Sequence, residues 1–413
     1  GRREGAGARR ALGCGAAQAL GAEARRRQVE RAAAEAGRAV EYRGDPLVEE
    51  AVALAESLLD ESLQVMTRAE AVQMKRVGQL VQSPQAKSLS MLMTDRLFRS
   101  RRAERTARGW RAVLGRVGLG KGFGLWDRLQ FRLGAAASKY LPAMVMDMVR
   151  KRLRREARNV ILSAEEPSLT DHLASRWRDG VGLNLNQLGE AVLGEEEAVN
   201  RLESLLALLG RPDVDYVSVK VSAIFSQINL VAPETTLEAI KGRLRRLYRA
   251  ALPERKFVNL DMEEYRDLAL TVAAFCEVLS EPEFKQLSAG LVLQAYLPDS
   301  IAAQQELTTW AQDRVAGGGE RIKVRIVKGA NLAMEAVEAE LHEWNPAFHR
   351  SKHDTDAAFR RMLEFACRPE NTKAVRIGVA SHNLFDIALA LVLRSRHGVE
   401  EAVGIEMLEG MAA

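Results

Sequence analysis

The sequence has few cysteines and few aromatic residues, the latter making up only 5% of the chain. Its three cysteines, Cys14, Cys276 and Cys367, are far apart and odd in number. They therefore form neither a disulfide framework nor the paired spacing of a zinc site. The simplest interpretation is that they are small buried hydrophobic residues. This usage is typical of a reducing cytosol, so we expect a cytoplasmic protein and predict no metal site.

Long apolar runs are absent as well. A membrane-spanning helix needs roughly 18 consecutive apolar residues. The best candidate, residues 375–393, is interrupted by Arg376, His382, Asn383 and Asp386. No signal peptide is evident, and the first residue is a glycine, so we expect the natural start to lie elsewhere. The 413 residues, 47% of them hydrophobic, are enough for two or three domains with a sizeable core.

Acidic residues are scarce in one part of the chain. Residues 91–160 contain 18 Lys and Arg against 5 Asp and Glu, although the net charge of the whole chain is only +5. Such a block attracts the phosphate groups of a nucleic acid or of a membrane surface. A solvated helical arm that docks on an acidic partner domain would explain it equally well.

The chain divides into three parts by composition and by the pattern of its apolar residues. Residues 1–44 are rich in Ala, Arg, Gly and Glu with little to bury, which indicates a disordered or frayed helical segment. Residues 45–160 have the periodicity of an α-helical arm domain. Asp45 and Pro46 would open it as N-cap and first helical residue, and the glycines of 115–124 would interrupt it. Residues 161–413 alternate between short β-rich runs and helical stretches.

Seven β-rich runs in the third part predict an α/β fold, a (β/α)8-type barrel. They lie roughly 25 to 55 residues apart, the length of a strand plus a crossover helix, which indicates parallel strands. The runs are residues 181–186, 216–221, 257–262, 290–296, 322–329, 374–383 and 403–408. Because we find seven runs, we expect a barrel that is incomplete at its carboxyl-terminal end.

One side of each predicted strand is apolar, and the other carries polar residues. Since side chains alternate along a strand, Val217 and Val219 would face the helices while Ser218 and Lys220 face the barrel interior. Barrel interiors are normally filled by Val, Ile and Leu, and unpaired buried polar groups are costly. The inward polar residues are Asn184, Asn186, Ser218, Lys220, Asn259, Asp261, Gln294, Lys323, Arg325, His382 and Glu406. Such a ring near the strand ends predicts a functional site.

Motifs in the same strands resemble those of the proline dehydrogenase family. Residues 325–330 match its R-x-V-K-G-A signature. The other matches are 219–223 to K-x-S-A, 260–264 to D-x-E-E, 294–296 to Q-A-Y, 352–356 to K-x-x-T-D, 381–383 to S-H-N and 406–411 to Q-x-L-x-G-M. Each match is weak alone, but the set has the right order and spacing from about residue 164 onward. Residues 93–99 resemble the arm of bifunctional proline utilisation A proteins, in which an aldehyde dehydrogenase domain follows the barrel.

This resemblance implies a flavin-binding barrel that oxidises L-proline to 1-pyrroline-5-carboxylate, a step in the catabolism of proline to glutamate. A hydride would pass from the ring carbon next to nitrogen to N5 of FAD, and the electrons would continue to a quinone. The parent protein would also carry an NAD-dependent L-glutamate γ-semialdehyde dehydrogenase. The resemblance further implies a homo-oligomer that contacts the inner face of a membrane peripherally.

The matched motifs also imply roles for individual residues. Lys220, Asp261 and Arg325 would be catalytic. Arg325 would stabilise negative charge on the flavin, Lys220 would bind the substrate carboxylate, and Asp261 would orient it. Leu408 would line the pocket for the proline ring. The implied cofactor-binding residues are Asp261, Met262, Gln294, Arg325, Val327, Lys328, Gly329, Ala330, Lys352, Thr355, Ser381, His382, Asn383 and Glu406.

The chain departs from the family pattern at three positions. Asn331 and Leu332 replace a common Tyr-Trp pair, so stacking against the flavin must differ there. Glu406 stands where Gln is common, and a carboxylate beside the flavin pyrimidine ring would have to be protonated or neutralised. The family's substrate-clamping Arg-Arg pair, on a helix after an eighth strand, is expected beyond Ala413. We therefore expect this chain by itself to be weakly active or inactive.

The residue types alone leave three alternatives open. Lys328 or Lys220 could be the Schiff-base nucleophile of a lyase or aldolase on the same fold. Lys220 and Asp261 could form an interior salt bridge that only closes the barrel. The basic block could belong to a nucleic-acid-binding regulator, although the sequence lacks the ribbon-helix-helix pattern of some bifunctional relatives, and we expect no nucleic-acid partner.

Overall fold

The computed structural model describes residues 44–68, 70–72, 83, 85, 92, 102–119, 124–157, 162–187, 192 and 194–409. The expectation for residues 1–43 and the arm-like segment 93–99 lie outside these described residues. The chain falls into two compact units. The first comprises Gly1–Glu56 and Arg176–Met407, and the second comprises Ser57–Ser175 and Leu408–Ala413.

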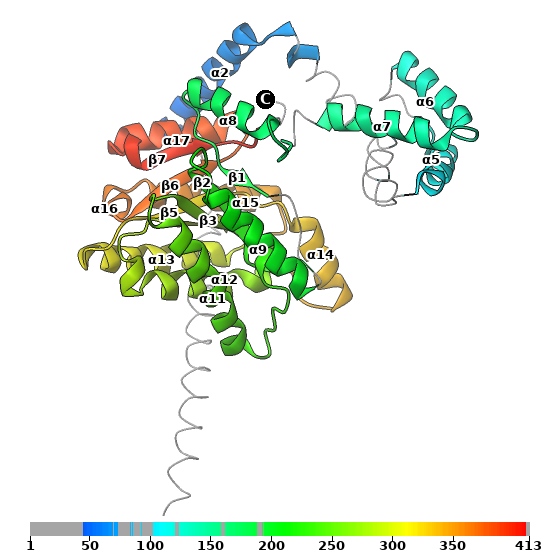
Figure 1. Ribbon diagram of the computed structural model, residues 1–413. Coiled ribbons are helices and arrows are strands. Elements are labelled where there is room, and N and C mark those ends of the chain that lie inside the picture. Colours follow the sequence, from blue (N-terminus) through cyan, green and yellow to red (C-terminus); the bar gives the residue numbers. More distant parts are fainter. Residues whose placement is uncertain are drawn as a thin grey trace, which may run out of the picture. The chain divides into compact units, whose positions relative to one another are not determined.

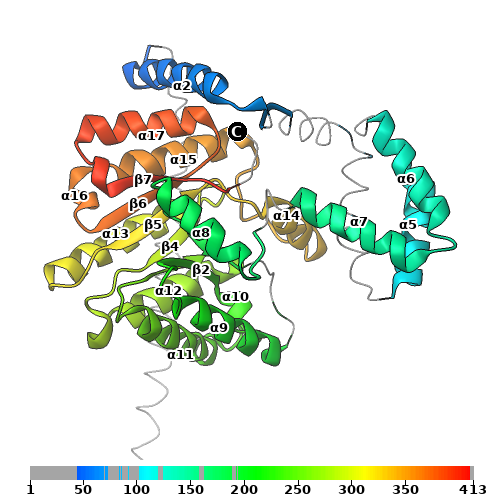
Figure 2. The ribbon, with the colours of Figure 1, turned by 45° about the horizontal axis from the view of Figure 1, so that its top comes forward.

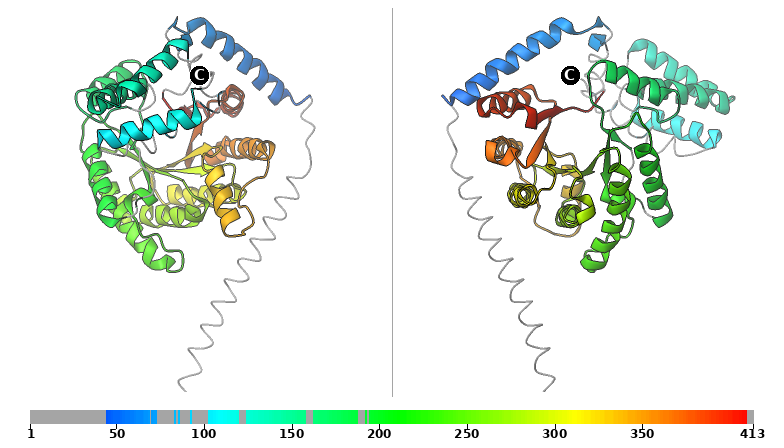
Figure 3. Two further views of the ribbon diagram at one scale, coloured as in Figure 1. Left: turned by 90° about the vertical axis from the view of Figure 1, so that its right-hand side faces the viewer. Right: turned by 60° about the vertical axis from the view of Figure 1, so that its left-hand side comes forward.

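The first unit contains a sheet of seven strands that follow one another in chain order (Figure 1). The strands are β1 (Leu185–Asn186), β2 (Tyr216–Lys220), β3 (Phe257–Asp261), β4 (Gly290–Gln294), β5 (Ile322–Val327), β6 (Val375–Ala380) and β7 (Val403–Glu406). Every neighbouring pair is parallel. The sheet curls into part of a barrel, with helices outside the curl (Figure 3). The predicted seven strands and incomplete barrel are therefore confirmed.

Helices between the strands cover the outer face of this sheet, as Figure 2 shows. The longer ones are α9 (Glu195–Leu209), α11 (Pro233–Ala251), α12 (Leu268–Leu279), α13 (Asp299–Ala316), α15 (Lys352–Ala366) and α17 (Leu384–His397). Shorter elements are α10 (Val221–Ile224), η2 (Tyr265–Asp267), η3 (Pro282–Phe284), α14 (Leu332–Leu341), α16 (Pro369–Thr372) and η4 (Glu400–Ala402). The crossover helices keep all strands parallel, so their carboxyl ends meet at one edge.

The predicted alternation of side chains is confirmed in the central strands. The apolar sets Val217 and Val219, Val258 and Leu260, Leu291 and Leu293, Val324 and Ile326, and Ile377 and Val379 are all buried. Their burial against the helices provides the apolar core of the unit. The prediction is wrong for Met407, which is exposed because β7 ends one residue earlier.

The second unit is helical in its described part. It contains α5 (Ala103–Val117), α6 (Leu125–Ala137) and α7 (Pro142–Ala157), whose small core is built around Trp110 and Met146. The glycine-rich stretch separates α5 from α6, as the sequence predicts. The helix α8 (Ser168–Arg178) follows α7, and α2 (Pro46–Val65) begins the described chain. Among the described residues, we find no helix with the length and apolar content needed to cross a membrane.

The start of α2 also behaves as the sequence predicts. Asp45 Oδ1 accepts a hydrogen bond from the backbone N–H of Leu47 at 3.0 Å, which is the N-cap contact expected before Pro46. The other carboxylate oxygen of Asp45 pairs with Arg360 on α15 at 2.7 Å. Local capping and a barrel contact therefore fix the same residue.

Candidate active site

A group of charged side chains meets inside the curled sheet. Arg325 on β5 is 9% exposed. Its guanidinium donates to Asp261 on β3 (Nη1–Oδ1, 3.0 Å), to Glu406 on β7 (Nε–Oε2, 2.7 Å) and to the hydroxyl of Tyr216 on β2 (2.7 Å). None of these strands is a direct neighbour of β5 in the sheet, so the contacts cross the interior. We call Tyr216, Asp261, Lys323, Arg325 and Glu406 the charged cluster.

Asp261 is fixed by donors from three strands. Besides Arg325, Asn186 Nδ2 donates to its Oδ2 at 2.7 Å and Asn259 Nδ2 donates to its Oδ1 at 3.0 Å. Burial raises the pKa of Asp261, and the Arg325 guanidinium opposes that shift. The carboxylate is thus buried, oriented and matched to one guanidinium, as a preorganised site requires.

Lys323 and Glu406 complete the cluster as an ion pair. The Lys323 ammonium also lies 4.9 Å from the centroid of the Tyr216 ring. Burial lowers the pKa of Lys323, and Glu406 opposes that shift. Gly378 on β6 makes room for the pair, because a β-carbon there would collide with Glu406 Oε1 and lie 3.0 Å from Lys323 Cε. The carboxylate that replaces the family's Gln is therefore neutralised by neighbouring cations.

Lys220 ends β2 and lies opposite Asp261 in the sheet register. Its ammonium nevertheless pairs with Glu263, at 2.8 Å, and the Ser222 hydroxyl donates to the same carboxylate at 3.0 Å. The alternative of an interior Lys220–Asp261 salt bridge is therefore wrong, because each residue has a closer opposite charge. The Lys220 side chain keeps a quarter of its surface exposed, so an anion can reach it.

Gln294, at the end of β4, has an unsatisfied acceptor. It is 3% exposed, and its Nε2 donates weakly to the carbonyls of Met262 (3.3 Å) and Glu263 (3.4 Å). Its Oε1 has no hydrogen-bond partner among the described residues. Because buried amide oxygens in folded proteins are almost always paired, this atom can accept a hydrogen bond from a water molecule or a ligand.

A second polar network lies just beyond the end of β5. Lys328 pairs with Asp356 on α15 (2.6 Å) and with Asp386 on α17 (2.8 Å). Lys352 also pairs with Asp356, at 2.6 Å, and the Ser381 hydroxyl donates to Asp386 at 2.8 Å. Burial lowers the pKa of Lys328, but the two carboxylates outweigh this effect and leave its pKa raised. The network connects the amino-terminal parts of two helices.

The remaining predicted residues lie in several parts of the chain. Asn383 caps α17, since its Oδ1 accepts from the N–H of Phe385 at 2.9 Å, and Thr355 lies in the first turn of α15. Gly329 has φ +119°, and a β-carbon there would overlap the ring of Tyr296, so the chain requires glycine. Val327 ends β5, Met262 follows β3, and His382 and Ala330 are exposed. Leu408 is 68% exposed and belongs to the second unit.

The structure therefore connects some predicted residues and leaves others apart. Asp261, Arg325 and Glu406 touch directly, while Lys220 and Gln294 lie at neighbouring strand ends. Sequence reasoning did not assign roles to Tyr216, Glu263, Lys323, Asp356 and Asp386. The signal available for Tyr216 and Lys323 was their position on the inward-facing side of their strands. For Asp386 it was an acidic residue in the first turn of a helix. Among the described residues, no group of His, Cys, Asp and Glu is arranged to hold a metal ion.

Comparisons with known proteins identify the family of the chain. The sequence profile of the proline dehydrogenase family matches residues 169–413. Proline utilization A from Corynebacterium freiburgense is 46% identical, over 71% of this chain and 30% of that one, with a TM-score of 0.61. Proline utilization A from Bdellovibrio bacteriovorus, inactivated by N-propargylglycine, is 26% identical, over 88% of this chain and 38% of that one, with a TM-score of 0.73.

A third solved structure, of proline utilization A from Bradyrhizobium japonicum, is 19% identical and supports the fold alone, with a TM-score of 0.59. No curated protein matched the sequence. The chain spans less than half the length of each of these three solved proteins. Because the family profile covers more than half of this chain, the protein belongs to the proline dehydrogenase family.

Proposed function

We propose that this protein binds FAD and oxidises L-proline to 1-pyrroline-5-carboxylate. The observation that carries the proposal is the charged cluster, with the buried Arg325 at its centre. The reaction removes a hydride from the ring carbon next to nitrogen and a proton from the nitrogen, leaving a carbon–nitrogen double bond. When bound, FAD supplies the chemistry by accepting that hydride at N5.

Three features of the described residues fit this cofactor. Gln294 Oε1 is a buried acceptor without a partner, which suits a ring N–H donor. Arg325 offers a cation where reduction adds negative charge. Ser351 and Asn383 cap the starts of α15 and α17, and the N-terminus of a helix favours an anionic group such as phosphate. Lys328 and Lys352 balance the carboxylates of Asp356 and Asp386 at these helix starts.

We assign the following roles to residues of the chain. Lys220 binds the substrate carboxylate and Asp261 orients the substrate. The other residues that we assign to cofactor binding are Met262, Val327, Gly329, Ala330, Thr355, Ser381, His382 and Glu406. Holding two planar reactants in register is the main task of the protein, because hydride transfer depends steeply on distance and alignment.

The Schiff-base alternative is disfavoured by the surroundings of its lysines. A nucleophilic lysine needs a lowered pKa, so that the neutral amine is available. Two carboxylates instead raise the pKa of Lys328. Lys220 pairs with Glu263 and lies in the part of the barrel that carries the family motifs. A purified protein without flavin absorbance, in which borohydride traps a carbonyl substrate on Lys220, would restore the lyase.

The wider cellular role rests on the resemblance alone. We propose a quinone as electron acceptor and a cytoplasmic location with peripheral contact at the inner face of a membrane. We also propose that the full-length protein is a homo-oligomer and carries an NAD-dependent L-glutamate γ-semialdehyde dehydrogenase.

Substitution of Arg325 tests the proposed function. Arg325→Met removes the cation that faces the developing negative charge. We expect weaker FAD retention, or reduction by proline slowed on the order of 10²-fold, the effect of losing one preorganised donor. Flavin absorbance of the purified protein and anaerobic reduction by proline measure the two effects.

Arg376→Met is the matched control. Arg376 is a partly buried arginine of β6 whose guanidinium lies 5.8 Å from the centroid of the Phe257 ring and donates to the Ser288 hydroxyl. Its guanidinium makes no hydrogen bond or ion pair with the charged cluster among the described residues, although its charge lowers the pKa of the neighbouring Lys323. Its loss should therefore affect stability and change flavin reduction far less than the loss of Arg325. Equal reduction rates in Arg325→Met and the wild type, at equal flavin loading, would remove Arg325 from the site.

A further inference from the structure

Lys323 and Glu406 form an ion pair, and the proposed function assigns no role to Lys323. They come from β5 and β7, and each side chain is 19% exposed. Glu406 is shared, because its Oε2 accepts from Arg325 Nε at 2.7 Å while its Oε1 faces Lys323. Burying two charges is costly, and a pair of neutral residues of similar volume would stabilise a barrel interior as well. Stability alone therefore does not account for the pair.

The residues around the ion pair leave space for it and stabilise the Lys323 cation. Gly378 leaves the space that both side chains occupy. The Lys323 ammonium lies over the rings of Tyr216 and Phe257, at 4.9 Å and 5.7 Å from their centroids, and such faces attract a partly desolvated cation. Lys323 is thus held from two sides, and its position fixes that of the Glu406 carboxylate.

The charges of the cluster balance. Two cations, Lys323 and Arg325, alternate with two carboxylates, Glu406 and Asp261, along one chain of contacts. Removing one member leaves a net charge of one unit within a site of low effective dielectric, where charges act strongly on their neighbours. Arg325 has Asp261 on one side and Glu406 on the other, so any change in Glu406 alters both the place and the effective charge of the guanidinium.

We propose that Lys323 and Glu406 are positioning residues that hold Arg325 and set the reduction potential of the bound flavin. This inference rests on the proposed function, because it needs a flavin beside Arg325. Glu406 lowers the potential by opposing the negative charge that reduction adds, and Lys323 limits that effect by neutralising the carboxylate. Neither residue needs to touch the substrate for this role.

The reduction potential of the FAD-loaded protein is the test, measured by dye-coupled titration. Glu406→Gln keeps the shape and removes one negative charge. The affinity of the protein for reduced relative to oxidised flavin should then rise about tenfold, which is about 30 mV upward for a two-electron couple. Lys323→Met removes one positive charge and should shift the potential downward by a similar amount. The double variant Lys323→Met/Glu406→Gln should return close to the wild type.

Two further variants separate this role from a structural one. Lys323→Arg keeps the charge and should keep the potential, even if it lowers the melting temperature. Lys241→Met removes a lysine of α11 that pairs with Glu277 outside the cluster, so it should lower stability without moving the potential. A shared loss of stability would appear in the melting temperatures of both lysine-to-methionine variants, but only Lys323→Met should change the potential.

The possible outcomes are distinct. Opposite shifts in the single variants and cancellation in the double variant support the inference. Unchanged potentials in flavin-loaded Glu406→Gln and Lys323→Met overturn it and leave the proposed function standing. A wild-type protein that retains no FAD overturns both. Should Lys323→Met fail to fold, Glu406→Gln and the double variant still decide, because only the former should shift the potential upward.

Discussion

Asp267, at the start of α12, is a buried acid with an unsatisfied oxygen. It is 5% exposed, and its Oδ1 has no hydrogen-bond partner among the described residues. Burial raises its pKa to about 6, and the nearby Glu264 adds to that shift. The folded state therefore keeps this proton at pH values where the unfolded chain has lost it. The contribution of Asp267 to stability should fall as the pH rises from about 4 to about 6, and should stay lower above that range.

Asp267→Asn should consequently stabilise the barrel unit at neutral pH. The gain should be about 1–3 kcal/mol, since each unit of pKa shift corresponds to about 1.4 kcal/mol. It should shrink as the pH is lowered through about 6 toward about 4, where the native carboxyl becomes protonated. Urea unfolding across this pH range measures the difference, and the exposed Asp60→Asn serves as control. A gain that does not depend on pH would contradict the assigned cause.

At this same scale, the sequence identified charged residues better than their partners. Arg325 and Asp261 stand out because they are polar and inward on strands that should bury only apolar groups. Their contact with each other, and that of Arg325 with Glu406, could not be predicted. Both contacts skip a strand and depend on how tightly the sheet curls. Lys220 shows the same limit, because register places it opposite Asp261, but its flexible side chain reaches Glu263.

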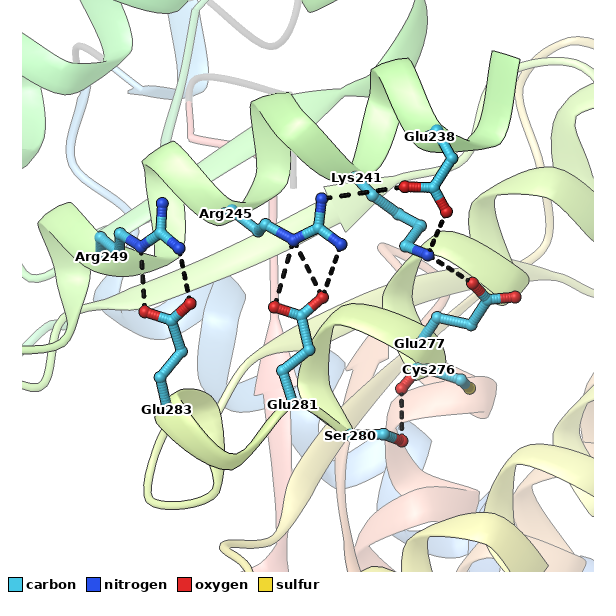
Figure 4. Close-up of polar contacts among 9 residues, drawn as sticks. All are labelled: Glu238, Lys241, Arg245, Arg249, Cys276, Glu277, Ser280, Glu281 and Glu283. Atoms are coloured by element: carbon cyan, nitrogen blue, oxygen red, sulfur yellow. Dashed lines mark hydrogen bonds and ion pairs between the residues drawn. The ribbon is translucent and has the colours of Figure 1, made fainter. Parts of the chain in front are cut away.

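At the scale of elements, a row of ion pairs connects α11 to α12 and η3 (Figure 4). Lys241, Arg245 and Arg249 are spaced four residues apart on α11 and therefore lie on one face. Their partners are Glu277 at 2.8 Å, Glu281 at 2.7 Å and Glu283 at 2.6 Å. Exposure of the basic side chain rises along the row, from 11% at Lys241 to 55% at Arg249.

The contribution of each ion pair to the free energy of unfolding should decrease along this row, from Lys241 to Arg249. Arg245 meets Glu281 through two nitrogens, so a double-mutant cycle with Arg245→Met and Glu281→Gln should give a coupling energy of about 0.5–1 kcal/mol. The exposed Arg249–Glu283 pair should give a smaller coupling that added salt removes. Urea unfolding at low and high salt measures both. A larger coupling for the exposed pair would contradict this ranking.

The boundaries of elements were largely predictable, because local signals and tertiary structure agree. Each β-rich run contains its strand, and Asp45-Pro46 marks the start of α2. Strands are shorter than the runs because motif residues such as Lys328 and Ser381 leave the sheet to meet the helix starts. The alternation of polar and apolar residues cannot show where a strand ends, since the polar residues that follow the strand continue its pattern.

At the scale of the whole molecule, the second unit exposes apolar side chains within a basic segment. On α6 these are Trp126, Leu129 and Leu133, and on α7 they are Met144 and Met148. The surrounding residues 91–160 contain 18 Lys and Arg against 5 Asp and Glu. Aromatic and aliphatic groups beside basic ones favour the boundary between lipid headgroups and acyl chains, and anionic lipids strengthen that preference.

We therefore expect the protein to bind vesicles rich in phosphatidylserine more strongly than neutral ones, with an affinity that falls as salt is added. Trp126→Ala combined with Leu133→Ala should weaken binding, because it removes apolar area and leaves the charge unchanged. Trp177→Ala, which removes another exposed tryptophan from α8, is the matched control and should have little effect. Vesicle sedimentation measures the bound fraction. Equal binding to neutral vesicles would exclude the electrostatic part of the argument. Stronger, salt-sensitive retention by duplex DNA would favour the nucleic-acid alternative instead, because phosphate contacts dominate such binding.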